Sequence, residues 1–341
     1  MTPRPWGELF TGESGLYLLI IMLGTVLYSV QVLALATIMP TVVEDLGGAA
    51  YYVWASMLYA VGSIVGAASL GPVWALVGGR RAFVAAGLVF AAGTAACAAA
   101  PDMLTLNAAR TVQGYGGGLV TGGLMAIVSQ LFRPEQRTRV LALYQGAWTV
   151  CSLLGPLFGG AFAQVGWWRG TFWTFLPFVL VFCLLAWWKI PDRLNPPAAS
   201  ARRPALPLAR LTALALGVVG VAYAGDLEHA VARATLLLVA TACIALAFRL
   251  DAQASSRLFP SHPLSFSRPV GLGFWVLIIG GGVQAAVTIY LPLALQVVHG
   301  VSPLWVGATH LVLSGSWTLA TFMASGWSGA RERPRCRPDR L

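Results

Sequence analysis

The sequence LYLLIIMLGTVLYSVQVLALATI, from Leu16 to Ile38, is a run of 23 residues without a charged side chain. About 20 helical residues are enough to cross the hydrocarbon core of a bilayer, which is about 30 Å thick. The apolar residues are continuous and do not alternate with polar ones. The run therefore predicts a transmembrane helix and not a strand of a β-barrel.

Nine similar runs follow, separated by short loops. They are Tyr52 to Val73, Ala82 to Ala100, Leu104 to Val128, Val140 to Val165, Phe172 to Trp188, Leu208 to Ala224, Ala232 to Phe248, Val270 to Val297 and Leu304 to Gly326. A soluble helical protein could bury one or two such runs. Ten of them predict an all-α polytopic membrane protein with about ten transmembrane helices.

The positive charge lies almost entirely on one side of the predicted membrane. Of the 22 basic residues, only Arg169 and Arg233 fall in loops of the opposite side, and Arg110 falls within a span. By the positive-inside rule, the N- and C-termini are expected in the cytoplasm. This topology explains the net charge of +10, so membrane lipids and not nucleic acid are the expected partners. The preference for Arg over Lys, with much Ala and Gly, suggests a bacterial inner (plasma) membrane.

The residues that commonly bind metals are scattered. Cys97, Cys151, Cys183 and Cys243 fall in four different spans, Cys336 falls in the tail, and the histidines are His229, His262, His299 and His310. Neither set has the spacing of a disulfide framework or a metal site. No catalytic or nucleotide-binding motif is present, so we expect no enzyme activity, metal or other cofactor.

Four short motifs stand out among the first five spans. They are QVLALATIMPT from Gln31 to Thr41, GPVWALVGGRR from Gly71 to Arg81, RTVQGYGGG from Arg110 to Gly118, and GPLFGG from Gly155 to Gly160. In the second motif, Gly71 and Gly78 permit a tight turn. Arg80 and Arg81 could cap helix ends or bind lipid phosphates.

In this order the motifs resemble those of the major facilitator superfamily, and the first resembles the first-helix motif of its fourteen-helix drug:proton antiporters. The resemblance covers roughly residues 16–326. It implies a six-helix N-terminal bundle, a central helix pair and two helices of an incomplete second bundle. The corresponding ranges are 1–190 for the first bundle, 191–207 for a cytoplasmic linker, 208–250 for the central pair, 251–328 for the two further helices, and 329–341 for an Arg/Pro-rich tail.

Arg110 is the main candidate for a functional site. A charge at the centre of a membrane costs about 2.5–3.5 kcal/mol on insertion scales, so Arg110 is expected to face a polar interior. It could hold helices together through backbone carbonyls, or it could contact substrate or tune a proton site. Other candidates for the transport path are Gln31, Gln113, Gln145, Trp148, Gln284 and His310. His310 could carry a proton or simply pack between helices.

Several glycines are spaced four residues apart, as in Gly114/Gly118 and Gly155/Gly159. This spacing lets helices approach closely. The Gly155-Pro156 pair predicts a break in the fifth span that could act as a pivot during alternating access.

Two positions depart from the family motifs. Gln31 and Ala75 stand where the superfamily usually has aspartate, and no Asp or Glu falls well inside any span. We therefore expect a neutral or anionic substrate that meets Arg110, or proton coupling that is altered or lost.

The resemblance implies a secondary transporter that exports small amphipathic, drug-like solutes in exchange for protons. Four of the fourteen expected helices are missing, and the tail could reflect truncation or be a genuine basic cytoplasmic segment. A transport-incompetent membrane fragment and an uncoupled facilitator therefore remain as alternatives. The sequence predicts no particular oligomeric state.

Overall fold

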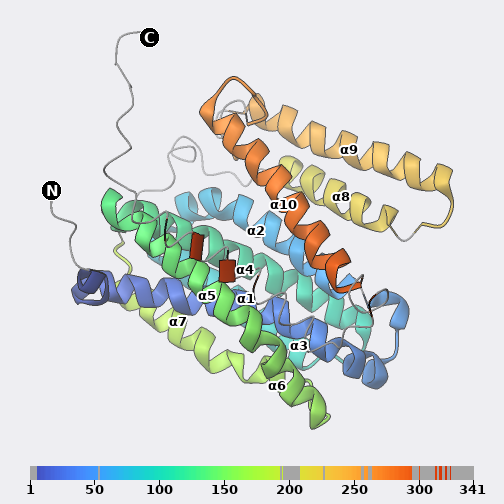
Figure 1. Cartoon of the computed structure of the whole chain (residues 1–341), viewed down its shortest axis with the longest axis horizontal. Helices are drawn as coiled ribbons and strands as arrows, with labels where there is room; N and C mark the ends of the chain where they lie inside the picture. Colours follow the sequence, from blue (N-terminus) through green and yellow to red (C-terminus); the bar gives the residue numbers. More distant parts are fainter. Residues whose placement is uncertain are drawn as a thin grey trace. The chain divides into compact units, whose positions relative to one another are not determined.

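A computed structural model describes most of the chain (Figure 1). It covers residues 6–52, 54–192, 194, 208–225, 227–254, 257–259, 263–293, 299, 312, 315–316, 319–320 and 323. The described part is helical and contains no strand.

The helices follow one another with short connections. Their bounds are η1 Trp6–Phe10, α1 Gly12–Leu46, η2 Ala49–Tyr51, α2 Trp54–Val77, α3 Gly79–Ala98, α4 Met103–Leu131, α5 Pro134–Gln164, α6 Gly170–Trp173, α7 Phe175–Lys189, α8 Leu208–Ala224, α9 Ala230–Ala252 and α10 Pro269–Leu293. The first nine predicted spans thus coincide with helices, the sixth being formed by α6 and α7 together. The tenth lies largely outside the described residues.

Six segments in the described part are long and apolar enough to cross a membrane. They are Gly12–Leu35, Ala49–Val77, Gly79–Ala98, Pro134–Gln164, Gly170–Lys189 and Ala230–Ala252. Leu208–Ala224 is a shorter apolar helix, and Pro269–Val283 is the apolar part of α10 in which the side chains are described. α4 has 29 residues and is not among the six, and it carries Asn107, Arg110 and Gln113 in its first half.

The described chain divides into two compact units. The first holds α1, α2 as far as Leu70, and α3 to α7, whereas the second holds α8 to α10 and residues 71–77. Within the first unit, α1 packs along α5, and α3 packs along α4 and α7. Figure 1 shows these helices as long, closely packed neighbours.

Glycines determine how closely α2 approaches α4. A Cβ atom added at Gly62 would overlap the carbonyl oxygen of Thr111, and one added at Gly118 would overlap the carbonyl oxygen of Ser63. Gly66 and Gly114 meet the opposite backbone in the same way. The small-residue spacing noted in the sequence therefore brings the two backbones into contact, which positions the first turns of α2 beside Arg110.

The second unit is built on the hairpin of α8 and α9. A Cβ atom at Gly217 would lie 2.5 Å from Cγ1 of Ile244, and one at Gly220 would lie 2.9 Å from Cβ of Ala240. Arg210 of α8 also pairs with Asp251 of α9 at 2.6 Å. The hairpin is thus held by close packing along its length and by an ion pair at one end.

The helix break that we expected at Gly155-Pro156 is absent. α5 is continuous from Pro134 to Gln164 with Pro156 inside it. In membrane helices, neighbouring helices and Ser or Thr side chains can compensate for the hydrogen bond that a proline removes. A pivot at this position would have to be a bend within a continuous helix.

Candidate functional site

The charged centre of the site is Arg110, whose residue is only 1% exposed. Its Nη1 donates a hydrogen bond of 2.6 Å to Oε1 of Gln113, one turn further along α4. Its Nε donates to the carbonyl oxygen of Ala55 in α2 at 3.4 Å. The guanidinium carbon lies 4.0 Å from the centre of the Tyr59 ring, a cation–π distance. Two turns of α2 therefore form one side of the arginine's environment.

Gln113 extends this arrangement to two further helices. Its Nε2 donates to Oγ1 of Thr94 in α3 at 2.9 Å and to Oε1 of Gln31 in α1 at 3.3 Å. Gln31 in turn donates through Nε2 to the carbonyl oxygen of Thr171 in α6 at 3.4 Å. We call Gln31, Thr94, Arg110, Gln113 and Thr171 the polar network. All five are buried.

The polar network carries a positive charge without a negative partner. No carboxylate of the described residues forms an ion pair with Arg110; its partners there are amide and carbonyl oxygens and an aromatic face. A buried cation of this kind is costly unless neutral dipoles or a bound ligand compensate it. An anionic or strongly hydrogen-bonding solute would supply that compensation.

One polar atom of the polar network and one beside it have no hydrogen-bond partner in the described part of the chain. They are the hydroxyl groups of Tyr59 and Thr171, and both are buried. Buried polar atoms without partners are uncommon in folded proteins and call for an explanation. Water or a polar group of a solute could satisfy them.

An aromatic group connects Arg110 to α5. The ring centres of Tyr28 and Tyr59 are 5.6 Å apart, and those of Tyr28 and Trp148 are 6.0 Å apart. The Tyr28 hydroxyl is hydrogen-bonded to Oγ of Ser63 at 3.0 Å. Trp148 and the partly buried Gln145 both lie on α5, which is therefore the helix that contacts Tyr28.

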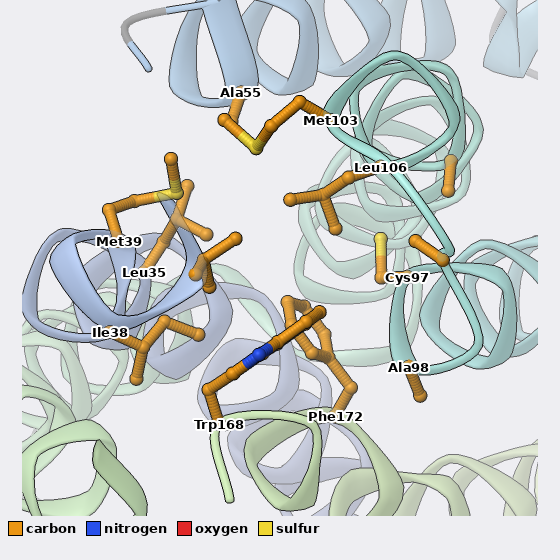
Figure 2. Close-up of a cluster of buried hydrophobic side chains, with 13 residues drawn as sticks. Leu35, Ile38, Met39, Ala55, Cys97, Ala98, Met103, Leu106, Trp168 and Phe172 are labelled. Carbon is orange, nitrogen blue, oxygen red and sulfur yellow. The ribbon is translucent and has the colours of Figure 1, made fainter. Parts of the chain in front are cut away.

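A cluster of buried hydrophobic side chains lies next to the polar network along the same helices, and Figure 2 shows the cluster. Leu35 follows Gln31 by one turn, Cys97 and Ala109 are neighbours of Thr94 and Arg110 on their helices, and Phe172 follows Thr171. Figure 2 shows Leu35, Cys97 and Phe172 converging with the side chains of Met39 from α1, Met103 and Leu106 from α4, and Trp168 from the loop before α6. The cluster separates the polar network from the ends of the helices that we predict to be non-cytoplasmic.

An ion pair lies at those helix ends, beyond the cluster. Asp45 at the end of α1 accepts hydrogen bonds from Nη1 of Arg169 at 2.5 Å and from Nε1 of Trp168 at 3.0 Å. Arg169 also donates to the carbonyl oxygen of Ala100 after α3 at 3.0 Å. The hydrogen bonds from Arg169 and Trp168 hold the pKa of Asp45 below its usual value of 3.8. This contact ties α1, α3 and α6 together at one end.

In the second sequence motif, from Gly71 to Arg81, Gly78 and Arg80 determine the shape of the loop between α2 and α3. Gly78 has φ +85°, which only glycine adopts without strain, and α3 begins at the next residue. Nε of Arg80 donates to the carbonyl oxygen of Ile190 at 2.8 Å and lies 3.1 Å from the carboxylate of Asp192. Arg80 thus caps the C-terminal end of α7, whereas Arg81 is exposed.

The glycines of the fifth-helix motif pack against α1. A Cβ atom at Gly155 would lie 2.8 Å from Cβ of Leu33, and one at Gly159 would lie 2.7 Å from the carbonyl oxygen of Ala34. Gly71 also lies within α2, and it is the first residue of this helix that belongs to the second unit.

The structure thus brings together three of the sequence candidates, Gln31, Arg110 and Gln113. Trp148 is connected to them through two aromatic contacts, with Tyr28 and from there with Tyr59. Gln284 lies in α10, but its side chain is not described, and His310 lies outside the described residues. Tyr59, Thr94 and Thr171 were missed by sequence analysis. Their residue types are ordinary in membrane helices, so only the position of Tyr59 near the glycines of α2 could have drawn attention to one of them.

Comparison with known proteins gives consistent matches. Residues 21–338 match the family model described as Major Facilitator Superfamily. The chain is 28% identical over 335 residues to a protein named probable multidrug-efflux transporter in Mycobacterium tuberculosis, and the match covers 96% of this chain and 69% of that protein. It is 27% identical over 307 residues to the efflux pump DEP3 of Alternaria brassicicola, covering 85% of this chain and 53% of that protein. Among solved structures, a proton:xylose symporter of the superfamily matches with a TM-score of 0.59 at 13% identity, over 92% of this chain and 68% of that one.

Proposed function

Since the chain belongs to the major facilitator superfamily, we propose that it exports small amphipathic solutes across the inner membrane by alternating access, coupled to the proton gradient. Membership makes it a multi-pass membrane transporter of small molecules and not an enzyme. The export direction and the drug-like substrate class are supported by relatives named as multidrug-efflux and efflux proteins. Cytoplasmic termini are supported by the charge distribution of the loops.

The observation that carries the proposal for the substrate is the buried guanidinium of Arg110, which has no carboxylate partner among the described residues. A cationic solute at this site would face an uncompensated like charge, whereas an anionic or neutral polar solute would receive charge-assisted hydrogen bonds. We therefore assign neutral and anionic amphipathic solutes as the preferred substrates.

The aromatic rings of Tyr28, Tyr59 and Trp148 would supply the apolar part of the same site. Aromatic side chains offer large contact areas, and a few polar groups beside them fix the orientation of a solute. The free hydroxyl of Tyr59 and the amide groups of Gln31 and Gln113 are the nearest such polar groups.

An uncoupled facilitator is the second candidate. Every polar member of the polar network is neutral except Arg110, and Gln31 stands where the family motif usually has aspartate. The polar network therefore contains no carboxylate that could carry a proton. Coupling would have to use another group, for which His310 remains our proposal.

The test is efflux of three dyes of similar size, one anionic, one neutral and one cationic, from cells that express the chain. Arg110→Gln should reduce efflux of the anionic dye about tenfold or more, because charge-assisted hydrogen bonds contribute about 1.5–3 kcal/mol each. Arg268→Gln, at an exposed arginine outside the motifs and the polar network, is the matched control and should leave efflux unchanged. If Arg110→Gln reduces the efflux of all three dyes equally, the arginine has a structural role and does not select the substrate.

A protonophore then distinguishes the two candidates. Efflux that stops when the proton gradient collapses supports coupling, and efflux that only follows the dye concentration gradient supports the facilitator. If the purified chain binds the dyes but cells move none of them, the chain is a binding-competent fragment without transport activity.

A further inference from the structure

A separate cavity of about 580 Å³ lies at the C-terminal end of α9, within the second unit. It is lined on one side by the last turn of α9, including Phe248, Arg249 and Asp251, and on the other by the following loop, including Arg257 and Phe259. We call it the α9-end pocket. It shares no residue with the polar network around Arg110.

Asp251 fixes the shape of this pocket. The residue is 2% exposed. Its Oδ1 accepts hydrogen bonds from Nη1 of Arg210 at 2.6 Å and from the backbone N–H of Leu258 at 2.8 Å, and its Oδ2 accepts from the N–H of Phe259 at 3.0 Å. The carboxylate thereby holds the loop onto α8 and α9, and both of its oxygens are engaged.

The apolar part of the pocket wall is held in place by two contacts. The rings of Phe248 and Phe259 lie with their centres 4.6 Å apart. On the far side, the carbonyl oxygen of Leu264 accepts a hydrogen bond of 3.1 Å from Nε1 of Trp275 in α10. The pocket is therefore lined by the end of α9 and by the loop that follows it, and Trp275 of α10 supports this loop through the backbone of Leu264.

Two arginines supply the charge of the pocket. Arg249 and Arg257 are both exposed, and neither side chain forms a hydrogen bond or ion pair with another described residue. The negative charge of Asp251 is already balanced by Arg210. The pocket thus combines two available guanidinium groups with aromatic walls at a helix end that the charge pattern predicts to be cytoplasmic.

We propose that the α9-end pocket binds the phosphate headgroup of an anionic phospholipid. The planar guanidinium groups of Arg249 and Arg257 match the geometry of phosphate oxygens. Phe248, Phe259 and Leu264 would contact the glycerol and the upper acyl chains. Basic pockets between helices on the cytoplasmic side are suited to this kind of headgroup. The apolar walls favour an amphiphile over a soluble phosphate.

The test is lipid binding to the purified full chain in neutral detergent, measured by native mass spectrometry. Phosphatidylglycerol should bind at least tenfold more tightly than phosphatidylcholine, and the double variant Arg249→Gln/Arg257→Gln should lose that preference. Arg268→Gln, at an exposed arginine that does not line the pocket, should retain it. Melting temperatures establish that the variants are folded.

Two outcomes would overturn the proposal. Unchanged preference for phosphatidylglycerol in the double variant would place the lipid elsewhere on the protein. Displacement of phosphatidylglycerol by inorganic phosphate alone, at equal concentration, would show that the pocket takes a soluble phosphate and not a lipid. Because the measurement needs no transport, its result is independent of whether the chain exports solutes.

Discussion

At the scale of single residues, the environment of Arg110 is unusual because neutral groups solvate its charge. Gln113 accepts the shortest of its hydrogen bonds and is itself held by Gln31 and Thr94. A glutamine can donate and accept at the same time, so it connects a donor-only arginine to further donors and acceptors. The buried charge is therefore distributed over several dipoles and does not rest on one ion pair.

Gln31→Asp should convert this arrangement into a proton-sensitive one. A carboxylate at this position would lie beside Gln113 and within the same hydrogen-bonded network as Arg110, so its ionised form would be favoured by the positive charge. We expect the variant to melt at a higher temperature than Gln31→Asn at neutral pH. We expect the difference to disappear as the pH falls and the carboxylate becomes protonated. Thermal unfolding of both variants in detergent from pH 8 to pH 4 measures this.

The same variant addresses coupling. If the missing carboxylate is what limits proton coupling, efflux by Gln31→Asp should become more dependent on the proton gradient than efflux by the unmodified chain. A pH-independent difference in melting between Gln31→Asp and Gln31→Asn would contradict the electrostatic explanation, whatever the effect on efflux.

At the scale of helices, close packing of α2 on α4 determines whether the site exists. A Cβ atom at Gly118 would overlap the Ser63 carbonyl oxygen, which belongs to the helix backbone and cannot move alone. At Gly122 on the same helix, the nearest atom is a methyl group of the flexible Leu70 side chain at 3.3 Å. The two glycines therefore form a matched pair: a Cβ atom fits at Gly122 and does not fit at Gly118.

Gly118→Ala should separate the two helices and weaken the contacts of Arg110 with Ala55 and Tyr59. Overpacking of this kind costs about 1–3 kcal/mol. Gly122→Ala should cost little, because alanine favours a helix over glycine by about 1 kcal/mol. Melting temperature and dye binding of the two variants measure the effect. Equal behaviour of the pair would show that the backbone contact at Gly118 does not control the site.

The contact between Asp45 and Arg169 has a pH dependence of definite sign. The hydrogen bonds from Arg169 and Trp168 depress the pKa of Asp45, so the stabilisation is present above its ordinary value of 3.8. It is lost as the pH falls through the lower value in the folded protein. Both side chains are partly exposed, at 48% and 32%, so the effect should be small and weakened by salt.

Asp45→Asn should therefore lower the melting temperature slightly at pH 7, and this deficit should begin to shrink as the pH falls below 3.8 toward the lower pKa of the folded protein. Glu44→Gln, at the exposed neighbouring carboxylate, is the control. A deficit of Asp45→Asn that persists unchanged at pH 3 would mean that the substitution acts through packing and not through charge.

At the scale of the whole molecule, the sequence was sufficient for the helices and only partly sufficient for the site. Continuous apolar runs predicted each described span, because lipid leaves the backbone no alternative to a helix. The ends were less well predicted: α1 extends from Gly12 to Leu46, well beyond the predicted Leu16 to Ile38. Polar residues can continue a helix beyond the lipid, and a prediction based on hydropathy does not include them in the helix.

The site was only partly predictable for a related reason. Arg110 and Gln113 are conspicuous because charged and amide side chains are rare in membrane helices. Thr94 and Thr171 are not, because threonine is common there, and Thr171 also contributes a backbone carbonyl oxygen that any residue could provide. Which helices meet at Arg110 depends on glycine contacts between α2 and α4. These contacts can be identified only from the three-dimensional structure.

The orientation predicted from charge can be tested across the whole chain. With the five native cysteines replaced by serine, single cysteines are introduced as Glu44→Cys and Arg81→Cys, both at exposed positions at opposite predicted faces of the membrane. A membrane-impermeant maleimide should label Glu44→Cys in intact cells and label Arg81→Cys only after the membrane is permeabilised, because the positive-inside rule predicts that the basic loops remain in the cytoplasm. The reverse pattern would invert the topology. It would also place the α9-end pocket on the opposite face from the one proposed, because the end of α9 lies on the same predicted side as Arg81. Labelling of both positions in intact cells would instead indicate two populations of opposite orientation, and the strong bias of arginine to one side makes that the result we least expect.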